Sequence, residues 1–332
     1  MIVKDTMAPF DLYQPVQLKD AFSLLENFGP DAWKMAGGYD SMDWFKDRAV
    51  RPKAVIDLTG IEEMKGIKET ADGVEIGALT TLTEIENNAI VKSKYRLLSN
   101  AVSHVASPQI RNHGTLGGNV SQNARCLYFR YGLPCYRAGG TTCFADTPEG
   151  INREHALFGA DRCVAVSSSD GAPALTALDA QFVVQSSGGQ RVVEAKDFFV
   201  GPDVDIMHLT STKPSEIVTA IRLPKIWANK NFYFEKVTDR NAWDFPLVNV
   251  AAAISVQNGA IADSRIVVGG VSAVPHRLTQ VEGIIQGKTL DESVASLAGQ
   301  SSTRDARPLN YNGFKIPLMA NLVTRAVRNA TA

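Results

Sequence analysis

The residues whose types and spacing most clearly suggest a chemical role are four cysteines that lie close together in the chain. Cys126, Cys135, Cys143 and Cys163 are the only cysteines among 332 residues. Clustered thiols can hold an iron–sulfur cluster, hold a zinc ion or form two disulfides. The spacing C-x8-C-x7-C-x19-C lacks the paired knuckles of structural zinc sites and is wider than bacterial ferredoxin runs. From spacing alone, a cluster, zinc and reduced unligated thiols all remain open.

Composition helps to choose among these explanations for the cysteines. The formal net charge is −1, so no field over the whole surface recruits nucleic acid or an anionic membrane. No apolar run approaches the roughly 20 residues that span a bilayer, and Met1 to Tyr13 lacks the apolar core of a signal peptide. We therefore expect a cytoplasmic chain with reduced thiols, which makes disulfides the weakest of the three explanations.

The segment around the cysteines also carries basic residues. Arginines that could offset the negative charge of a thiolate-ligated cluster stand at Arg125, Arg130, Arg137 and Arg162. Cys163 has a second interpretation as a small buried apolar residue, because Val164-Ala165-Val166 follows it.

Two Gly-Gly segments form a second group of candidates. Ala36 to Ser41 lies between an expected strand and an expected helix, and Thr115 to Asn119 reads as a similar glycine-rich turn. Glycine lets backbone amides approach a ligand closely, and amides at a helix N-terminus suit a phosphate. Each segment alone is as well explained by a tight turn. Together they predict two backbone cradles for one pyrophosphate, in a chain without a G-x-G-x-x-G fingerprint.

The hydrophobic pattern predicts elements that position these segments. A helix is expected over residues 18–28, because apolar residues recur at helical spacing before Gly29-Pro30. Helices are also expected over 95–106 and 172–180, a hairpin over 181–193, and strands over 232–237, 247–256 and 266–272. Ser169-Asp170 reads as a helix N-cap. Lys236, Arg240 and Asp244 read as a solvated charged edge of a strand.

In this order, the segments resemble the FAD-binding middle subunit of the molybdenum hydroxylases, the xanthine dehydrogenase and carbon monoxide dehydrogenase family. The resemblance rests on A-G-G-x-D at residues 36–40, R-N at 111–112 with T-L-G-G-N at 115–119, S-D-x-A-P-A-L at 169–175, K-x-x-x-R at 236–240, and G-G-V at 269–271 with Pro275. It covers nearly the whole chain.

The resemblance implies an α+β fold in three parts. An FAD-binding domain of the PCMH/vanillyl-alcohol-oxidase type would consist of subdomains at residues 1–60 and 61–225, with the cysteine loop at 120–165. A C-terminal α+β domain of the CO dehydrogenase flavoprotein type would occupy residues 231–332. Residues 225–230 would link the two.

The resemblance also implies a set of FAD-binding residues. The Gly-Gly segments would hold the FAD pyrophosphate with help from Thr115 and Asn119. Asp170 would lie towards the ribityl and flavin end, and Lys236 would face the isoalloxazine, where a cation stabilises reduced flavin. Relatives commonly have Thr or His where this chain has Tyr39. The full set is Ala36, Gly37, Gly38, Tyr39, Asp40, Ser41, Arg111, Thr115, Gly117, Gly118, Asn119, Ser169, Asp170 and Lys236.

The cysteine loop resembles an insertion found in one subset of the family. That subset includes the periplasmic aldehyde oxidoreductase and 4-hydroxybenzoyl-CoA reductase, whose flavin subunit carries an extra 4Fe–4S cluster. The form R-C-x-Y-F at residues 125–129, followed by H-A-x-x-G-x-x-x-C at 155–163, looks closer to the aldehyde oxidoreductase. The resemblance therefore implies cluster ligation by Cys126, Cys135, Cys143 and Cys163.

The implied function is electron transfer within a three-subunit molybdenum hydroxylase, with no catalytic acid, base or nucleophile on this chain. A large subunit would hold molybdopterin, a small subunit would hold two 2Fe–2S clusters, and an external acceptor such as ferredoxin would take the electrons. The extra cluster would be a one-electron port between FAD and that acceptor. A Tat signal on the small subunit would place the complex in the periplasm.

Three alternatives remain beside this function. In a 4-hydroxybenzoyl-CoA reductase, electrons would flow inward from ferredoxin to molybdenum. A zinc-stabilised binding module would have no redox role. A self-contained flavin oxidase is less favoured, since the sequence shows no signature of a pocket for an organic substrate.

Overall fold

The computed structural model describes residues 7–330. Residues 1–6, part of the segment in which no signal peptide is predicted, lie outside this range, as do residues 331–332. Among the described residues, no helix has the length and apolar character needed to cross a membrane.

A small parallel sheet opens the fold. Its strand order is β1-β3-β2, with bounds Asp11–Tyr13, Ala54–Asp57 and Ala32–Met35. Helix α1, Leu18–Phe28, matches its predicted bounds, because its apolar stripe is buried at spacings of three and four residues. The helix ends where Gly29 adopts a φ of +51°, a conformation open to glycine. Helix α2, Tyr39–Lys46, begins directly after Gly37-Gly38.

A five-stranded antiparallel sheet forms the second layer. Its order is β4-β5-β8-β6-β7, with bounds Ile67–Thr70, Gly73–Gly77, Ile217–Pro224, Gln181–Ser186 and Gly189–Glu194. Strands β6 and β7 form the predicted hairpin. The helices of this region are α3 Leu82–Asn87, α4 Ala89–Lys94, α5 Arg96–Ser103, α6 Pro108–Arg111, α7 Leu116–Ser121, α9 Gly171–Ala177 and α10 Ala195–Phe198.

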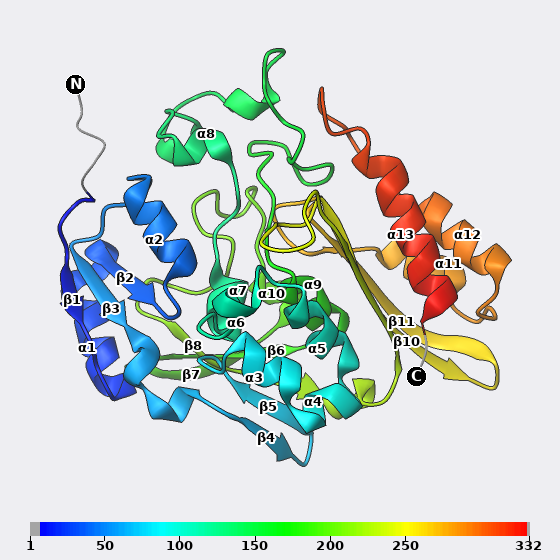
Figure 1. The fold of residues 1–332 in the computed structure, drawn as a ribbon, viewed down its shortest axis with the longest axis horizontal. Coiled ribbons are helices and arrows are strands. Elements are labelled where there is room, and N and C mark those ends of the chain that lie inside the picture. The colour runs from blue at the N-terminus through cyan, green and yellow to red at the C-terminus, as the bar shows by residue number, and fades with distance from the viewer. Residues whose placement is uncertain (1–6, 331–332) are drawn as a thin grey trace.

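The cysteine loop leaves this layer between α7 and α9. It contains helix α8, Leu127–Arg130, and projects at the top of the molecule in the view of Figure 1. An isolated bridge between Arg125 and Val166 joins its two ends, and the amide of Arg125 donates to the carbonyl of Val166 at 2.8 Å. The loop is therefore closed at its base.

A four-stranded antiparallel sheet and three helices complete the chain. The strand order is β12-β11-β10-β9, with bounds His276–Arg277, Ala260–Gly269, Val248–Gln257 and Asn231–Val237. The helices are α11 Thr279–Ile285, α12 Glu292–Ser301 and α13 Lys315–Asn329. Figure 1 shows β10 and β11 between these helices and the part of the chain that contains the first two sheets.

Three predicted elements differ from the structure. The helix expected over 95–106 ends at Ser103, and Ala106 adopts a φ of +45°. The helix expected over 172–180 spans Gly171–Ala177, since Asp179 has a φ of +46°. The strand expected over 266–272 is β11, which begins at Ala260 because Asn258-Gly259 forms a tight turn with positive φ at both residues.

Candidate functional site

The structure brings the two Gly-Gly segments together. A Cβ on Gly37 would lie 2.4 Å from the carbonyl oxygen of His113, so the first segment packs against the backbone that leads into the second. A Cβ on Gly118 would lie 3.9 Å from Cβ of Ala36. Gly38 has a φ of +81° and is the N-cap of α2 without a side-chain cap. The first backbone amides of α2 therefore have no capping side chain. They follow Gly37, which packs against the backbone leading into the second Gly-Gly segment.

The second segment is a helix start rather than a turn. Thr115 is the N-cap of α7, and its Oγ1 accepts from the amide of Gly118 at 3.1 Å. The amide of Gly117 donates to the carbonyl of Ala78 at 2.8 Å, and a Cβ on Gly117 would lie 2.8 Å from Cβ of Ala78. The prediction of a turn was wrong because the side chain of Thr115 caps a helix that includes both glycines.

Side chains of the first segment point to other protein groups. Asp40 accepts from Nε1 of Trp44 at 2.9 Å and from Nη2 of Arg130 at 3.1 Å, which ties α2 to α8. Burial raises the pKa of Asp40, and the contacts with Trp44 and Arg130 oppose this change. Ser41 Oγ accepts from Nε1 of Trp33 at 2.9 Å. Tyr39 is 45% exposed.

Asn119 and Ser169 connect α7 to α9. Oδ1 of Asn119 accepts from Oγ of Ser169 at 2.6 Å and from the amide of Gly171 at 3.2 Å. Oγ of Ser169 accepts in turn from the amide of Ala172 at 3.0 Å. Ser169 thus caps the helix start with its side chain, whereas Asp170 makes no such bond.

Asp170 and Lys236 form a buried ion pair between the start of α9 and the C-terminal sheet. Nζ of Lys236 lies 2.7 Å from Oδ2 of Asp170, and their side chains are 5% and 3% exposed. Nζ also donates to the carbonyls of His104 and Asp244, each at 2.8 Å. Oδ1 of Asp170 accepts from Nδ2 of Asn249 at 2.8 Å. Burial raises the pKa of Asp170, and the charge of Lys236 opposes this change.

The predicted solvated edge at Lys236 was therefore wrong. The cation is buried, with three acceptors for its three N–H groups, although Arg240 and Asp244 do pair nearer the surface at 3.4 Å. Arg111 is likewise held by the protein, since its Nε donates to Glu86 at 3.0 Å and its Nη1 to the carbonyl of Val105 at 2.9 Å. Arg111 fixes the segment that precedes α7.

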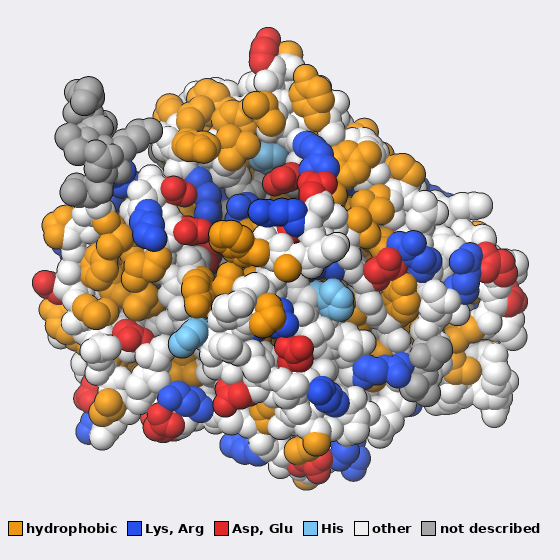
Figure 2. All heavy atoms as spheres, viewed as in Figure 1, with side chains coloured by type: hydrophobic (Ala, Val, Ile, Leu, Met, Phe, Trp, Pro, Cys, Tyr) orange, Lys and Arg blue, Asp and Glu red, His pale blue; other side chains and the backbone are white. Residues whose placement is uncertain are grey.

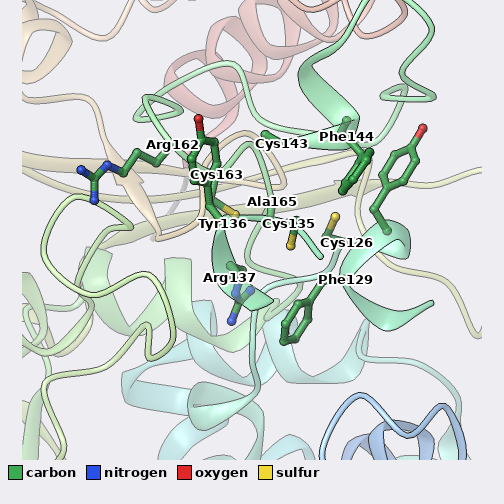
Figure 3. Close-up of a pocket in the computed structure, with 12 residues that line it drawn as sticks. Cys126, Phe129, Cys135, Tyr136, Arg137, Cys143, Phe144, Arg162, Cys163 and Ala165 are labelled. Atoms are coloured by element: carbon green, nitrogen blue, oxygen red, sulfur yellow. The ribbon is translucent and has the colours of Figure 1, made fainter. Parts of the chain in front are cut away.

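The four cysteines line one small pocket, which Figure 3 shows in close-up. All four are free thiols, and Cys126, Cys135 and Cys163 are buried. Burial raises the pKa of Cys163 and that of Cys126, the latter to about 11, whereas a thiol that coordinates a metal is deprotonated outright. Within residues 7–330, no three His, Cys, Asp or Glu side chains are placed to hold one metal ion together.

Arg137 is a buried cation at this pocket. It lines the pocket with the cysteines and is 2% exposed. Its Nη2 donates to Oδ1 of Asn123 and to the carbonyl of Met207, but Nε and Nη1 have no partner. Burial lowers the pKa of Arg137, and the nearby cysteines and Asp205 oppose this change.

The other arginines predicted to offset the charge of a cluster differ from Arg137 in their surroundings. Arg162 also lines the pocket and is exposed. Cζ of Arg125 lies 3.8 Å from the ring centroid of Phe245, and Nη2 of Arg130 donates to Asp40.

Two residues outside the predicted set hold the cysteine loop. Nε2 of His155 lies 3.5 Å from Sγ of Cys126, and burial lowers the pKa of His155 to about 4, so the imidazole is neutral at pH 7. Nζ of Lys315, at the start of α13, donates to the carbonyls of Glu154, His155 and Gly270 at 2.7–3.1 Å. Only the H-A-x-x-G-x-x-x-C spelling around His155 gave a sequence signal for either residue.

A larger open cleft adjoins both parts of the site. Arg130, which holds Asp40, lines it together with Cys126 of the cysteine pocket, and Ser168 borders it beside the Ser169-Asp170 segment. Figure 2 shows apolar side chains gathered over α8, with Lys, Arg, Asp and Glu side chains directly below them. The cleft therefore adjoins the cysteine pocket at Cys126 and reaches the first Gly-Gly segment only through Arg130, which contacts Asp40.

Comparison with known proteins identifies the class of this flavoprotein. Residues 8–226 match the family described as the FAD binding domain in molybdopterin dehydrogenase, and residues 233–330 match the CO dehydrogenase flavoprotein C-terminal domain. The chain belongs to this family of FAD-binding oxidoreductase subunits. The predicted family, fold class and oxidoreductase assignment are confirmed.

Similar chains come from several dehydrogenases. The chain is 30% identical over 305 residues to the glyceraldehyde dehydrogenase medium chain of Sulfolobus acidocaldarius, covering 92% of this chain and 91% of that one. It is 32% identical to the aldehyde oxidoreductase FAD-binding subunit of Escherichia coli K12, covering 91% and 92%. A carbon monoxide dehydrogenase structure from Hydrogenophaga pseudoflava has the same fold, with a TM-score of 0.78, 24% identity and 98% of each chain covered.

Proposed function

We propose that this chain is the FAD-containing electron-transfer subunit of a molybdenum hydroxylase complex that oxidises aldehydes. The proposal rests first on the contact between the two Gly-Gly segments, inside a domain whose family binds FAD. Two relatives at 30% identity or more are named for glyceraldehyde and aldehyde oxidation. Their names as medium chain and subunit support a complex with a molybdopterin subunit and a 2Fe–2S subunit.

The residues that would hold FAD divide by role. The backbone of Gly37, Gly38 and α7 would approach the pyrophosphate, since a side chain at Gly37 would clash with the opposing backbone. The Asp170–Lys236 pair would form a wall of the flavin site between the FAD-binding part and the C-terminal sheet. Asn119 and Arg111 would act by holding α7, α9 and the segment before them. Bound FAD supplies the change between two-electron and one-electron chemistry.

The cysteine pocket is proposed to hold a 4Fe–4S cluster. Four thiols that surround one space without converging on a single point fit a cube, because each cysteine binds a different iron. The unpartnered nitrogens of buried Arg137 further support an anionic group, because a buried charge without a counter-charge is costly. A bound cluster supplies single-electron transfer, which suits an external acceptor such as ferredoxin.

Purification of the native complex tests the proposal. We expect co-purifying large and small subunits, molybdenum, flavin and iron, with flavin bands above broad iron–sulfur absorption, and reduction by aldehydes. A colourless chain without flavin would overturn the main proposal, and zinc in place of iron would overturn the cluster. Oxidation of the ferredoxin-reduced complex by 4-hydroxybenzoyl-CoA, with no reduction of the complex by aldehydes, would assign the alternative direction of electron flow.

The cysteines have their own test within the complex. Cys→Ser variants that fold and retain flavin should lose iron and slow turnover with ferredoxin. Full ferredoxin turnover without the cluster would contradict its role as a one-electron port. Fractionation of the source cells tests the proposed cytoplasmic location against export of the complex through its small subunit.

A further inference from the structure

Arg137 is a buried charge whose electrostatic partner is missing from the protein side chains. Its side chain is almost fully enclosed, and among residues 7–330 no carboxylate lies within ion-pair distance of it. A guanidinium in such a place is normally matched by an anion, because the cost of burial reaches several kcal/mol. Among residues 7–330, no carboxylate therefore forms an ion pair with this buried guanidinium.

The contacts of Arg137 leave a specific part of the guanidinium available. Nη2 is held by Asn123 and the carbonyl of Met207, and the ring of Phe129 lies 4.8 Å from Cζ. These contacts fix the plane of the guanidinium. The two nitrogens without a partner, Nε and Nη1, belong to the residue that lines the cysteine pocket.

Three buried thiols lie at the same pocket. Cys126, Cys135 and Cys163 line it together with Arg137. Thiolates in these positions would therefore supply the missing negative charge. N–H groups directed at thiolate or sulfide sulfur stabilise the state with more negative charge, and such hydrogen bonds are one of the factors that set iron–sulfur potentials.

We propose that Arg137 is a positioning residue for the redox centre in the cysteine pocket: its Nε and Nη1 donate to cluster or thiolate sulfur and raise the reduction potential of the cluster. The inference rests on the proposed cluster. It explains why a cation is buried here with two unused donors, although the exposed Arg162 on the same pocket would suffice for a general balance of charge.

The first test measures the midpoint potential by an EPR-monitored redox titration of the intact complex. Arg137→Gln should shift the equilibrium between oxidised and reduced cluster at least tenfold towards the oxidised form, which is about 59 mV for one electron. Arg137→Lys, which keeps the charge but loses the planar donors, should give a smaller shift. Arg162→Gln is the matched control: it removes an exposed charge from the same pocket, and because solvent screens that charge it should shift the potential clearly less than Arg137→Gln.

Two outcomes of this titration separate the inference from the proposed function. Wild-type iron content in Arg137→Gln with an unchanged potential would overturn the role of Arg137 and leave the cluster in place. A wild-type complex whose iron content and EPR signals are those of the 2Fe–2S clusters alone would overturn the cluster itself.

A second measurement does not depend on the Arg137 variants retaining the cluster. Arginine labelled with 15N in the guanidinium should give a nitrogen coupling in electron spin-echo spectra of the reduced wild-type cluster. Arg162 is the other arginine that lines the pocket, and the coupling should persist in the Arg162→Gln variant. Its absence from the wild type, or its loss in Arg162→Gln, would overturn the inference.

Discussion

At the scale of single residues, the flavin site depends on a position where no side chain fits. A Cβ on Gly37 would lie 2.4 Å from the carbonyl oxygen of His113 and 3.0 Å from Cα of Gly114. Backbone atoms cannot rotate away as a flexible side chain does, so the two Gly-Gly segments would have to separate. Gly37→Ala should therefore lower stability by about 1–3 kcal/mol and weaken FAD binding, as measured by urea unfolding and flavin content.

Gly283 provides the control for this substitution. It lies inside α11, and a Cβ there would meet nothing within 4 Å. Gly283→Ala should leave flavin content unchanged and raise stability by about 0.5–1 kcal/mol, because alanine favours the helix. Equal effects of the two substitutions would contradict the importance of the contact with His113.

The Asp170–Lys236 pair gives the second prediction at this scale. Asp170→Asn removes the carboxylate from a buried cation, and breaking a buried pair in this way costs about 3–5 kcal/mol. The exposed pair of Arg153 and Asp239 is the comparison, since it lies at the surface, and Asp239→Asn should cost less than about 1 kcal/mol. Urea unfolding of both variants measures the difference. Similar losses would contradict the larger cost of removing one partner from the buried pair.

The chemistry of these residues could be predicted from their types, but their partners could not. Glycine pairs and clustered cysteines restrict what a segment can do, so the Gly-Gly segments and the cysteine group were recognisable in advance. The partner of Asp170 is 66 positions away, and the isolation of Arg137 depends on what all its neighbours lack. Neither is encoded in local spacing.

At the scale of elements, local patterns placed the helices and strands better than they placed their ends. The stripe of α1 is complete within one helix, so its bounds were predictable. Val105 and Ala106 continue the apolar pattern of α5 although the backbone has left the helix, because apolar residues pack equally well from a turn. The Asn258-Gly259 turn, by contrast, was a readable signal for the hairpin of β10 and β11.

Helix α13 gives the prediction at this scale, since Lys315 at its start holds the cysteine loop. Burial lowers the pKa of Lys315 to about 7, with Glu154 raising and Arg153 lowering it, against about 10.4 in an unfolded chain. Between these values the unfolded chain binds more protons, so the unfolding free energy rises with pH. The penalty for burying the charged amine is thus full below about pH 7 and fades above it.

Lys315→Met removes this dependence. The unfolding free energy of the wild type minus that of the variant should increase between about pH 7 and about pH 9, as measured by urea unfolding at several pH values. A difference that stays flat or falls would show that Lys315 remains fully charged in the folded protein across this range.

At the scale of the whole molecule, the C-terminal sheet is shared by two hydrophobic cores. Strand β10 is buried on both faces. Ala251 and Ala253 belong to the core of the FAD-binding part, whereas Val250 and Ala252 belong to the core beneath α11, α12 and α13. Helices α5 and α9 pack on one face of the sheet and α13 on the other. The two family matches meet near residue 230, yet the packing crosses that boundary.

A shared core predicts that the chain unfolds as one unit. Ala251→Leu and Ala252→Leu add the same volume to opposite faces of β10, and each should lower stability by about 1–3 kcal/mol. Because the faces belong to one sheet, both variants should shift a single transition in which tryptophan fluorescence and far-UV circular dichroism coincide.

The fluorescence reports mainly on the FAD-binding part, where Trp33, Trp44 and Trp227 lie. Val256→Thr, at the 36% exposed end of β10, is the control. If Ala252→Leu shifted the dichroism and left the fluorescence transition unchanged, the C-terminal part would fold independently, and the flavin wall formed by Asp170 and Lys236 would join two separable domains.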